Sequence, residues 1–427
     1  ETQSTADVDA QGNTVAVVPA RQPFGLDLYD DYYVLKVAPS GQVIWRRRVD
    51  GWASGPDMPY AVASDLNGDV VVTGRTVNGS GGHDVLTVKL AGTTGLTLWR
   101  SLVPGIDATR PTAGRELEIS PDGDVFVAAE TSGLQSGEDV LLFKLAGESG
   151  ALLWRNTYQR SVGAWSHDRA AAMILGPDGD LFVGCSTESV ISGGDASVLK
   201  ISGVDGQVVW VRHLQGEGGA TTESAVDLEM AQDGRVILLV NALTDLTAQD
   251  YLTIALDASD GDETWRVWYS GAGGARDDSP SDLAVDMAGD IVVTGRSENA
   301  AGDRDFATVS YAVEDGAQRW VARYDAAGEH EDAIAVVAGF PGSVVVSGIG
   351  RSVAADEGFL TISYSISDGQ EQWLRRYDHA MGPLRDRVLS MGVDSVGDPR
   401  VVGVSWDGAD TSLDVIRYRA ADGDLLW

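Results

Sequence analysis

Carboxylates recur along the chain in two series, and each series is acidic in seven of eight copies. The first series lies eleven residues before a repeated glycine, with Thr112 as its exception, and comprises Glu1, Asp57, Asp168, Glu223, Asp278, Glu331 and Asp386. The second series has Gly358 as its exception and comprises Asp31, Asp84, Asp139, Asp195, Asp250, Asp305 and Asp414. Carboxylates are hard oxygen ligands for calcium, and they are also strong acceptors for backbone N–H groups.

The spacing of the acids favours the second of these roles. Calcium takes about six to eight oxygen ligands, and one carboxylate per repeat in each series supplies too few of them. No segment has the dense D-x-D-x-D-G spacing of a dedicated calcium loop. We therefore expect the acids to act mainly as structural clips that hold loops or neighbouring repeats, with weak calcium binding as the alternative. No other metal and no cofactor is expected.

Three tryptophans stand outside any repeated position and are candidates for binding. Trp52 and Trp165 are expected in loops between repeats, and Trp406 at the edge of a loop within a repeat. Exposed indoles can stack on sugars or anchor a protein partner, so we predict a protein or glycan partner here. The alternative is that these side chains fold back onto the rim of the domain.

Composition excludes several classes of function. The 64 acidic and 31 basic residues give a net charge of −33, which argues against nucleic acid and against an anionic membrane surface as partners. No run approaches the ~18 uninterrupted apolar residues of a membrane span. Cys185 is the single cysteine, so a disulfide within the chain is impossible. Nucleophile-elbow, phosphate-loop and dinucleotide motifs are absent, and we do not expect an enzyme.

A regular series of tryptophans shows which elements position these residues. Eight tryptophans recur at intervals of 53 to 56 residues, namely Trp45, Trp99, Trp154, Trp210, Trp265, Trp320, Trp373 and Trp427. A glycine stands four residues before each one, and a second glycine series follows segments such as "SDLN" and "SPD". Both glycines are typical of short hairpin turns, so each repeat predicts four short strands.

Four-stranded repeats of this length with no helix between them predict a β-propeller. We expect an all-β fold with a single eight-bladed propeller, four antiparallel strands per blade, in phase with the repeat, as one domain over residues 1–427. The expected blades are about 1–50, 57–104, 112–159, 168–214, 223–270, 278–325, 331–378 and 386–427. The alanine-rich first strand should be innermost and the tryptophan strand outermost, with each indole between neighbouring blades. The longer connections should share one face, which is the predicted functional face.

Two family resemblances appear in these repeats. Segments such as "VASDLNGDVVVTGRT" resemble the bacterial seven-bladed β-propeller repeat family. That resemblance implies an exported protein, extracellular, on the cell surface or periplasmic, that binds or scaffolds without catalysis at the bacterial surface or in extracellular matrix. The segment "LDASDGDETW" and its siblings resemble the tryptophan-docking repeats of eight-bladed quinoprotein dehydrogenases and of propeller lipoproteins that assist outer-membrane protein assembly. This second resemblance leaves two alternatives open, a periplasmic outer-membrane assembly propeller and a quinoprotein-like enzyme.

Overall fold

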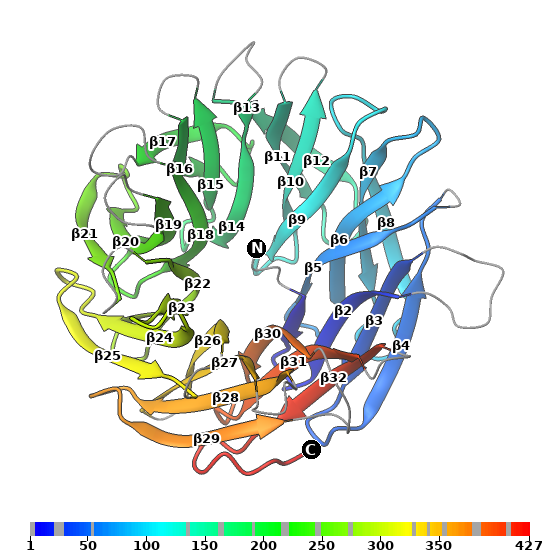
Figure 1. Cartoon of the computed structure of the whole chain (residues 1–427). Helices are drawn as coiled ribbons and strands as arrows, with labels where there is room; N and C mark the ends of the chain where they lie inside the picture. Colours follow the sequence, from blue (N-terminus) through cyan, green and yellow to red (C-terminus); the bar gives the residue numbers. More distant parts are fainter. Residues whose placement is uncertain are drawn as a thin grey trace. The chain divides into compact units, whose positions relative to one another are not determined.

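The computed structural model shows an all-β chain that forms two compact units, Gln3–Leu214 and Gln215–Trp427, the latter grouped with Glu1–Thr2. It describes residues 5–20, 30–52, 55–133, 137–160, 166–189, 193–214, 222–243, 249–271, 276–326, 330–339, 342–351, 357–377, 386–406 and 411–427. Each unit is a succession of four antiparallel sheets, the blades (Figure 1). Among these residues there is no helix with the length and hydropathy needed to cross a bilayer.

Blades one to four make up the N-terminal unit, and their strands follow one another from the inner to the outer position. Blade one has β1 (Ala6–Val8), β2 (Thr14–Ala20), β3 (Asp31–Val37) and β4 (Val43–Val49). Blade two has β5 (Met58–Ser64), β6 (Val70–Val77), β7 (His83–Leu90) and β8 (Thr97–Val103). Blade three has β9 (Thr112–Ile119), β10 (Val125–Gly133), β11 (Gly137–Leu145) and β12 (Leu152–Tyr158). The short β13 (Ser166–His167) pairs with β11, and blade four has β14 (Arg169–Leu175), β15 (Leu181–Ser189), β16 (Gly193–Ile201) and β17 (Val208–Leu214).

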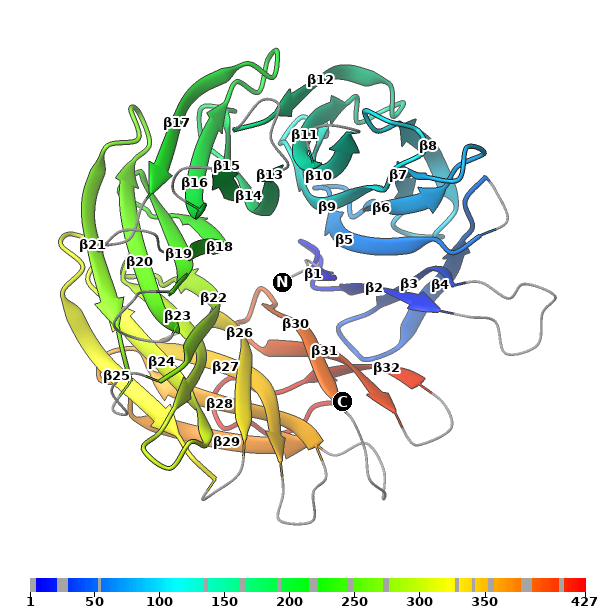
Figure 2. The ribbon, with the colours of Figure 1, turned by 45° about the horizontal axis from the view of Figure 1, so that its top comes forward.

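Blades five to eight make up the C-terminal unit in the same order. Blade five has β18 (Thr222–Met230), β19 (Arg235–Leu243), β20 (Gln249–Asp257) and β21 (Glu263–Tyr269). Blade six has β22 (Asp278–Val285), β23 (Ile291–Glu298), β24 (Arg304–Tyr311) and β25 (Gln318–Tyr324). Blade seven has β26 (Glu331–Gly339), β27 (Ser343–Arg351), β28 (Glu357–Ser365) and β29 (Glu371–Tyr377). Blade eight has β30 (Arg387–Val393), β31 (Pro399–Trp406) and β32 (Thr411–Arg417). The succession of strands within a blade can be followed in blade five, from β18 to β21 (Figure 2).

The predicted fold class, an all-β propeller with eight blades, is confirmed. Blade eight differs in one detail, because its fourth strand is reduced to an isolated bridge between Tyr418 and Leu425. Within each unit the inner strands of consecutive blades contact one another, as the small residues of these strands predicted. That residues 1–427 form one domain stays a prediction.

Glycines at positive φ form the hairpin turns that the repeats predicted. Gly68, with φ of 79°, closes the turn between β5 and β6, and Gly95, with φ of 66°, closes the turn between β7 and β8. Residues with a β-carbon rarely adopt this backbone conformation, which is why glycine recurs at both turns.

Inside each unit, the tryptophan of one blade packs on the glycine turn of the next blade. A β-carbon on Gly95 would lie 2.7 Å from the Trp45 ring, and one on Gly150 would lie 2.6 Å from the Trp99 ring. The Trp45 indole N–H also donates to the Gly92 carbonyl at 2.8 Å. The same contacts occur at every junction inside either unit, which confirms the predicted position of the indoles between blades.

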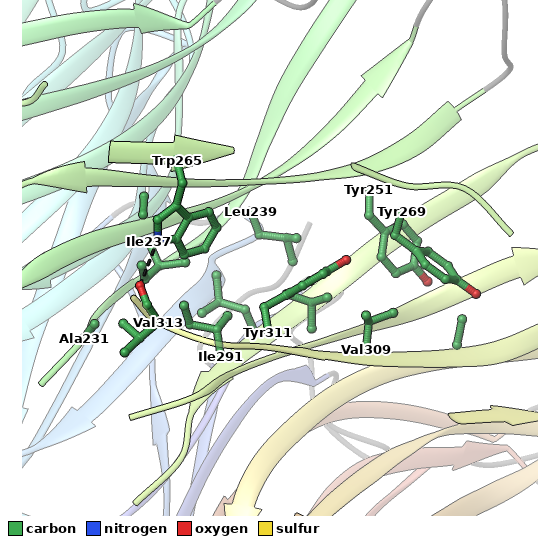
Figure 3. Close-up of a cluster of buried hydrophobic side chains, with 14 residues drawn as sticks. Ala231, Ile237, Leu239, Tyr251, Trp265, Tyr269, Ile291, Val309, Tyr311 and Val313 are labelled. Carbon is green, nitrogen blue, oxygen red and sulfur yellow. Dashed lines mark hydrogen bonds between the residues drawn. The ribbon is translucent and has the colours of Figure 1, made fainter. Parts of the chain in front are cut away.

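Hydrophobic residues from two facing sheets surround each of these indoles. Between blades five and six, Trp265 packs with Ile237 and Leu239 of one blade and with Ile291 and Tyr311 of the next (Figure 3). Its indole N–H donates to the Val313 carbonyl at 2.8 Å. The indole therefore links two blades through apolar burial and a satisfied polar atom.

All four lysines of the chain form a feature that the repeats did not predict. Each lies on the third strand directly opposite a tryptophan, in blades one to four. Lys36 pairs with Asp9 and Lys89 with Asp65, both at 2.8 Å, and all four residues are buried. Lys144 pairs with Asp124 at 3.0 Å and Lys200 with Asp178 at 2.7 Å, and the aspartates of these two pairs are more exposed. These ion pairs connect the third strand to the first hairpin of the same blade.

Replacing a junction tryptophan should destabilise the protein. Trp99→Ala should lower the free energy of unfolding by about 3 to 5 kcal/mol, because the side chain is 7% exposed and its loss leaves a cavity. Trp52→Ala is the control, since that indole is 73% exposed and its loss should change stability by less than about 0.5 kcal/mol. Chemical denaturation measures both variants. Equal stabilities would contradict the role given to the indoles.

Candidate functional site

The structure brings the two acidic series together at junctions between consecutive blades. At the junction of blades one and two, carboxylate oxygens of Asp31, Asp50 and Asp57 lie within 4.8 Å of one another. Asp31 begins β3, Asp50 follows β4, and Asp57 directly precedes β5. An acid of one blade therefore meets an acid of the next blade, and a third acid comes from the connection between them.

Main-chain and arginine contacts hold this group of carboxylates. The Asp57 side chain accepts the N–H of Gly51, and the Asp57 N–H donates to the Asp30 carbonyl at 2.7 Å. Arg48 of β4 forms an ion pair with Asp31. Asp31 and Asp57 are buried, whereas Asp50 is exposed. The group is thus open to solvent on the side of Asp50.

The same arrangement recurs in the C-terminal unit, at the junction of blades six and seven. There, carboxylate oxygens of Asp305, Asp325 and Glu331 lie within 4.8 Å of one another. Arg323 of β25 pairs with Asp305 at 2.8 Å, at the position that Arg48 occupies in blade one. The Asn299 amide also donates to Asp305, at 3.1 Å.

Burial makes these carboxylates costly to ionise. It raises the pKa of Asp31, against the hydrogen bond and charge of Arg48. It also raises the pKa of Asp57, although hydrogen bonds from Thr76 and Gly51 lower it in part. Burial raises the pKa of Asp305 as well, and the hydrogen bond and charge of Arg323 lower it in part. Three carboxylates beside one guanidinium leave an excess of negative charge when ionised. Chemically, the group can accept further N–H donors or attract a divalent cation.

At two other junctions, the acid likewise accepts backbone N–H groups. Asp168 accepts the N–H groups of Arg160 and Glu188, at 2.8 and 3.1 Å, and Asp278 accepts the N–H of Gly271 at 2.5 Å. In blade three, where threonine replaces the acid, the hydroxyl groups of Thr112 and Thr131 lie 3.2 Å apart. A hydroxyl pair thus occupies the position that a carboxylate occupies elsewhere.

The remaining acids of the two series occupy equivalent positions. Asn78 donates to Asp84 at 2.9 Å, Arg160 pairs with Asp195, and the Ser405 hydroxyl donates to Asp414 at 2.6 Å. Glu223, Asp139, Asp250 and Asp386 are buried at their strand starts. Glu1 lies outside the described residues. The role of these acids as clips or as weak calcium ligands stays a prediction.

Of the three candidate tryptophans, the structure places one side chain. Trp52 lies in the connection between β4 and β5 and is 73% exposed, two residues from Asp50. Trp406 ends β31, where it pairs with Thr411, and its side chain lies outside what the structure describes. Trp165 lies outside the described residues. The exposed indole beside the acidic junction is therefore the aromatic part of the candidate site.

A third group of carboxyl groups, on the inner strands, was missed by sequence reasoning. Asp227 of β18 and Asp282 of β22 are hydrogen-bonded to each other through their side chains. Asp227 also accepts the Leu283 N–H at 3.1 Å, and Asp282 accepts the Val336 N–H at 2.7 Å. Each acid therefore caps a backbone N–H of the next inner strand. The available signal was an acid at the same position of two consecutive repeats.

Burial sets the protonation of this inner-strand group. It raises the pKa of Asp282 well above its ordinary value, and the charge of Asp227 adds to the effect. Burial also raises the pKa of Asp227, and a hydrogen bond between two carboxyl groups needs one proton. Burial and the charge of Asp227 raise the pKa of nearby Glu229 to about 7.

Comparison with known proteins identifies similar chains. Residues 136–427 match the sequence model of a family described as outer membrane protein assembly factor BamB. Among solved structures, quinohemoprotein alcohol dehydrogenase from Comamonas testosteroni is 10% identical with a TM-score of 0.53, over 94% of this chain and 71% of that chain. A europium-containing methanol dehydrogenase is 11% identical with a TM-score of 0.53, over 91% and 80% of the two chains. No significant match was found among curated proteins.

These matches correct one of the two resemblances drawn from the sequence. The resemblance to seven-bladed repeat proteins is not supported, because the chain forms eight blades and most of it matches another family. The resemblance to outer-membrane assembly propellers and quinoproteins is supported. At 10% and 11% identity, the likeness to the two dehydrogenases shows the fold alone.

If the junction acids are clips, their removal should cost stability regardless of calcium. Asp57→Ala should lower the free energy of unfolding by about 1 to 3 kcal/mol, because the half-buried Gly51 N–H loses its acceptor. Asp50→Ala, which removes the exposed acid of the same group, should change it by less than about 0.5 kcal/mol.

Thermal melts with calcium and with a chelator test this prediction for the wild type and both variants. All three proteins should melt at temperatures that calcium leaves unchanged. A wild-type melting temperature that rises with calcium, together with variants that lose this rise, would instead identify an ion site, since a ligand stabilises the state that binds it.

The raised pKa of Glu229 predicts a pH-dependent stability. The pKa of Glu229 in the folded state, about 7, lies above its value in the unfolded chain. At pH values between these two pKa values, the folded state therefore binds one more proton than the unfolded state. This stability is fully present below about pH 4.3 and is lost as pH rises through about 7, an effect of about 1 to 3 kcal/mol. Glu229→Gln should therefore show a flatter fall in stability over that window. Parallel curves for variant and wild type would contradict the prediction.

Proposed function

Because the chain belongs to the family described as outer membrane protein assembly factor BamB, we propose that it is a non-catalytic, protein-binding propeller that takes part in outer-membrane protein assembly. The family match favours this role over a scaffold at the cell surface or in extracellular matrix, which the repeats alone had suggested. The proposed location is accordingly the bacterial envelope, as an exported protein.

The observation that carries the proposal is the exposed indole of Trp52. An indole that is 73% exposed gains little from folding, and its position beside Asp50 and Gly51 places an apolar surface within a charged, loop-bearing region. Tryptophan surrounded by polar residues is the residue type most enriched among energetic anchors of protein interfaces. We propose that this connection between blades one and two contacts a protein partner.

The polar residues of the chain support a binding role over a catalytic one. A redox enzyme needs one asymmetric site, whereas the junction carboxylates recur at equivalent positions from blade to blade. Cys185, the single cysteine, is buried, and burial raises the pKa of its thiol far above the range in which a nucleophile is useful. The alternative of a quinoprotein-like enzyme therefore rests on the shared fold.

A complementation experiment tests the proposed function. Cells that lack the gene should contain less folded outer-membrane β-barrel protein, and the wild-type gene should restore the amount. Trp52→Ala should restore it incompletely, because the anchor is lost while the fold is kept. Leu66→Ala, which removes another exposed side chain from a hairpin turn, is the control and should restore it fully.

Two results would contradict the proposal. Unchanged amounts of folded barrel protein in cells that lack the gene would refute the assembly role. Dye-linked dehydrogenase turnover by purified protein after addition of pyrroloquinoline quinone would refute its non-catalytic character.

A further inference from the structure

Exposed apolar side chains recur on the outer strands of the N-terminal unit. The residue directly before each tryptophan is apolar and between 40% and 53% exposed in all four blades, at Ile44, Leu98, Leu153 and Val209. The residue two before the tryptophan is also apolar and exposed in three of these blades, at Val43, Leu152 and Val208. We call these seven residues the rim patch. It lies on different residues from the Trp52 connection.

A β-bulge explains why these side chains are exposed. In blade one, Lys36 pairs with Trp45 and Val37 pairs with Val43, so Ile44 is an extra residue without a partner opposite. The same register shift occurs at Leu98, Leu153 and Val209. The bulge turns the tryptophan toward the core and leaves the preceding residue outside. An apolar residue at this position therefore contributes little to the core.

The C-terminal unit shows that the bulge does not require an apolar residue. The same register shift occurs in blades five, six and seven, where the extra residues are Thr264, Arg319 and Gln372. Leu425 and Leu426 of blade eight are apolar and exposed. The fold thus accepts polar residues at the bulge. Stability of the fold therefore does not explain why this residue is apolar in four consecutive blades, and exposed apolar groups of this kind are typical of binding surfaces.

Contacts between blades fix how consecutive outer strands meet. Trp45 lies on Gly95, and Arg47 donates to the Gly95 carbonyl at 3.1 Å, so the outer strand of blade one meets the turn that leads into β8. Trp99 and Trp154 meet the turns that lead into β12 and β17 in the same way. The exposed apolar residues therefore stand at the same position of four consecutive blades.

The patch is positively charged within an acidic protein. The residue after the tryptophan is an exposed arginine in blades one to three, at Arg46, Arg100 and Arg155. Glu148 and Asp205 occupy the turns of blades three and four, so the positive charge is greatest on blades one and two. A partner that complements this surface combines apolar with acidic groups.

The outer strands also offer backbone groups for pairing. In the described structure β4, β8, β12 and β17 each pair with a strand on one side only. A strand edge without a neighbouring strand presents N–H and C=O groups with which an extended segment can pair. This feature favours a polypeptide over other apolar partners.

We propose that the rim patch is a docking surface for an extended polypeptide segment that carries apolar and acidic side chains. A second copy of this chain fits poorly, because a symmetric pairing of the patch would place arginines against arginines. An anionic membrane surface is repelled by the net charge of −33. The inference does not rest on the proposed assembly function.

Fluorescence anisotropy tests the proposal with two labelled ten-residue peptides, one alternating valine with glutamate and one alternating valine with lysine. The full chain should bind the glutamate peptide saturably and at least tenfold more tightly than the lysine peptide, although its net charge favours lysine. Ile44→Gln combined with Leu98→Gln should weaken this binding at least tenfold. Leu66→Gln, an exposed leucine away from the patch, should leave it unchanged.

Several outcomes would overturn the proposal. Equal binding by the wild type and the double variant, absence of saturable binding, or a preference for the lysine peptide would each do so. A wild-type dimer in sedimentation that the double variant loses would assign the patch to a second copy. Binding to phosphatidylglycerol vesicles that the double variant loses would assign it to a membrane.

Discussion

The indole docked on a glycine turn of the next blade is the contact on which the rest of this structure depends. The β-carbon of any other residue at that turn would lie within 2.6 to 2.8 Å of the ring at most junctions, and the backbone there has positive φ. The outer strand of one blade and the last hairpin of the next therefore cannot vary independently. A β-bulge precedes the indole in blades one to seven of the described structure.

Ion pairs and aromatic rings both support this contact. In the N-terminal unit, a lysine opposite each tryptophan pairs with an aspartate of the first hairpin. Aromatic rings lie near indoles in both units, with Phe126 at 6.1 Å from Trp154 and Tyr364 at 6.5 Å from Trp320. Buried ion pairs contribute little net stability, but their loss is costly, so they specify one arrangement of strand and hairpin. Repeats of similar sequence thus use ionic or aromatic support for one geometry.

Acidic groups at the junctions and on the inner strands share one role, which is to accept hydrogen bonds in partly buried surroundings. Several of them accept backbone N–H groups of a loop or an inner strand, as Asp57 does for Gly51 and Asp227 does for Leu283. Burial raises the pKa of these carboxyl groups, so the hydrogen bonds must offset the cost of ionisation. Residues that depart from the repeat, such as Trp52, carry no such structural duty and are the better candidates for partner recognition.

The sequence by itself determined the eight repeats, the four-strand blade and the position of the indoles, because these depend on local turns and on the alternation of side chains. Glycine spacing predicts a hairpin wherever it occurs, and the tryptophan period predicts how the hairpins stack. The two acidic series were likewise visible as residues at fixed positions.

Only the tertiary structure decided which of these residues meet. Asp31 meets Asp57 of the next blade, Lys36 reaches Asp9 of its own blade, and Asp227 bonds to Asp282 across two inner strands. Equivalent positions in a repeat specify a shared environment, but distances between blades depend on how the sheets pack and twist, which one-dimensional spacing does not encode. The exposure of the rim patch has the same origin, since a bulge shifts a side chain outward without changing the pattern of residue types.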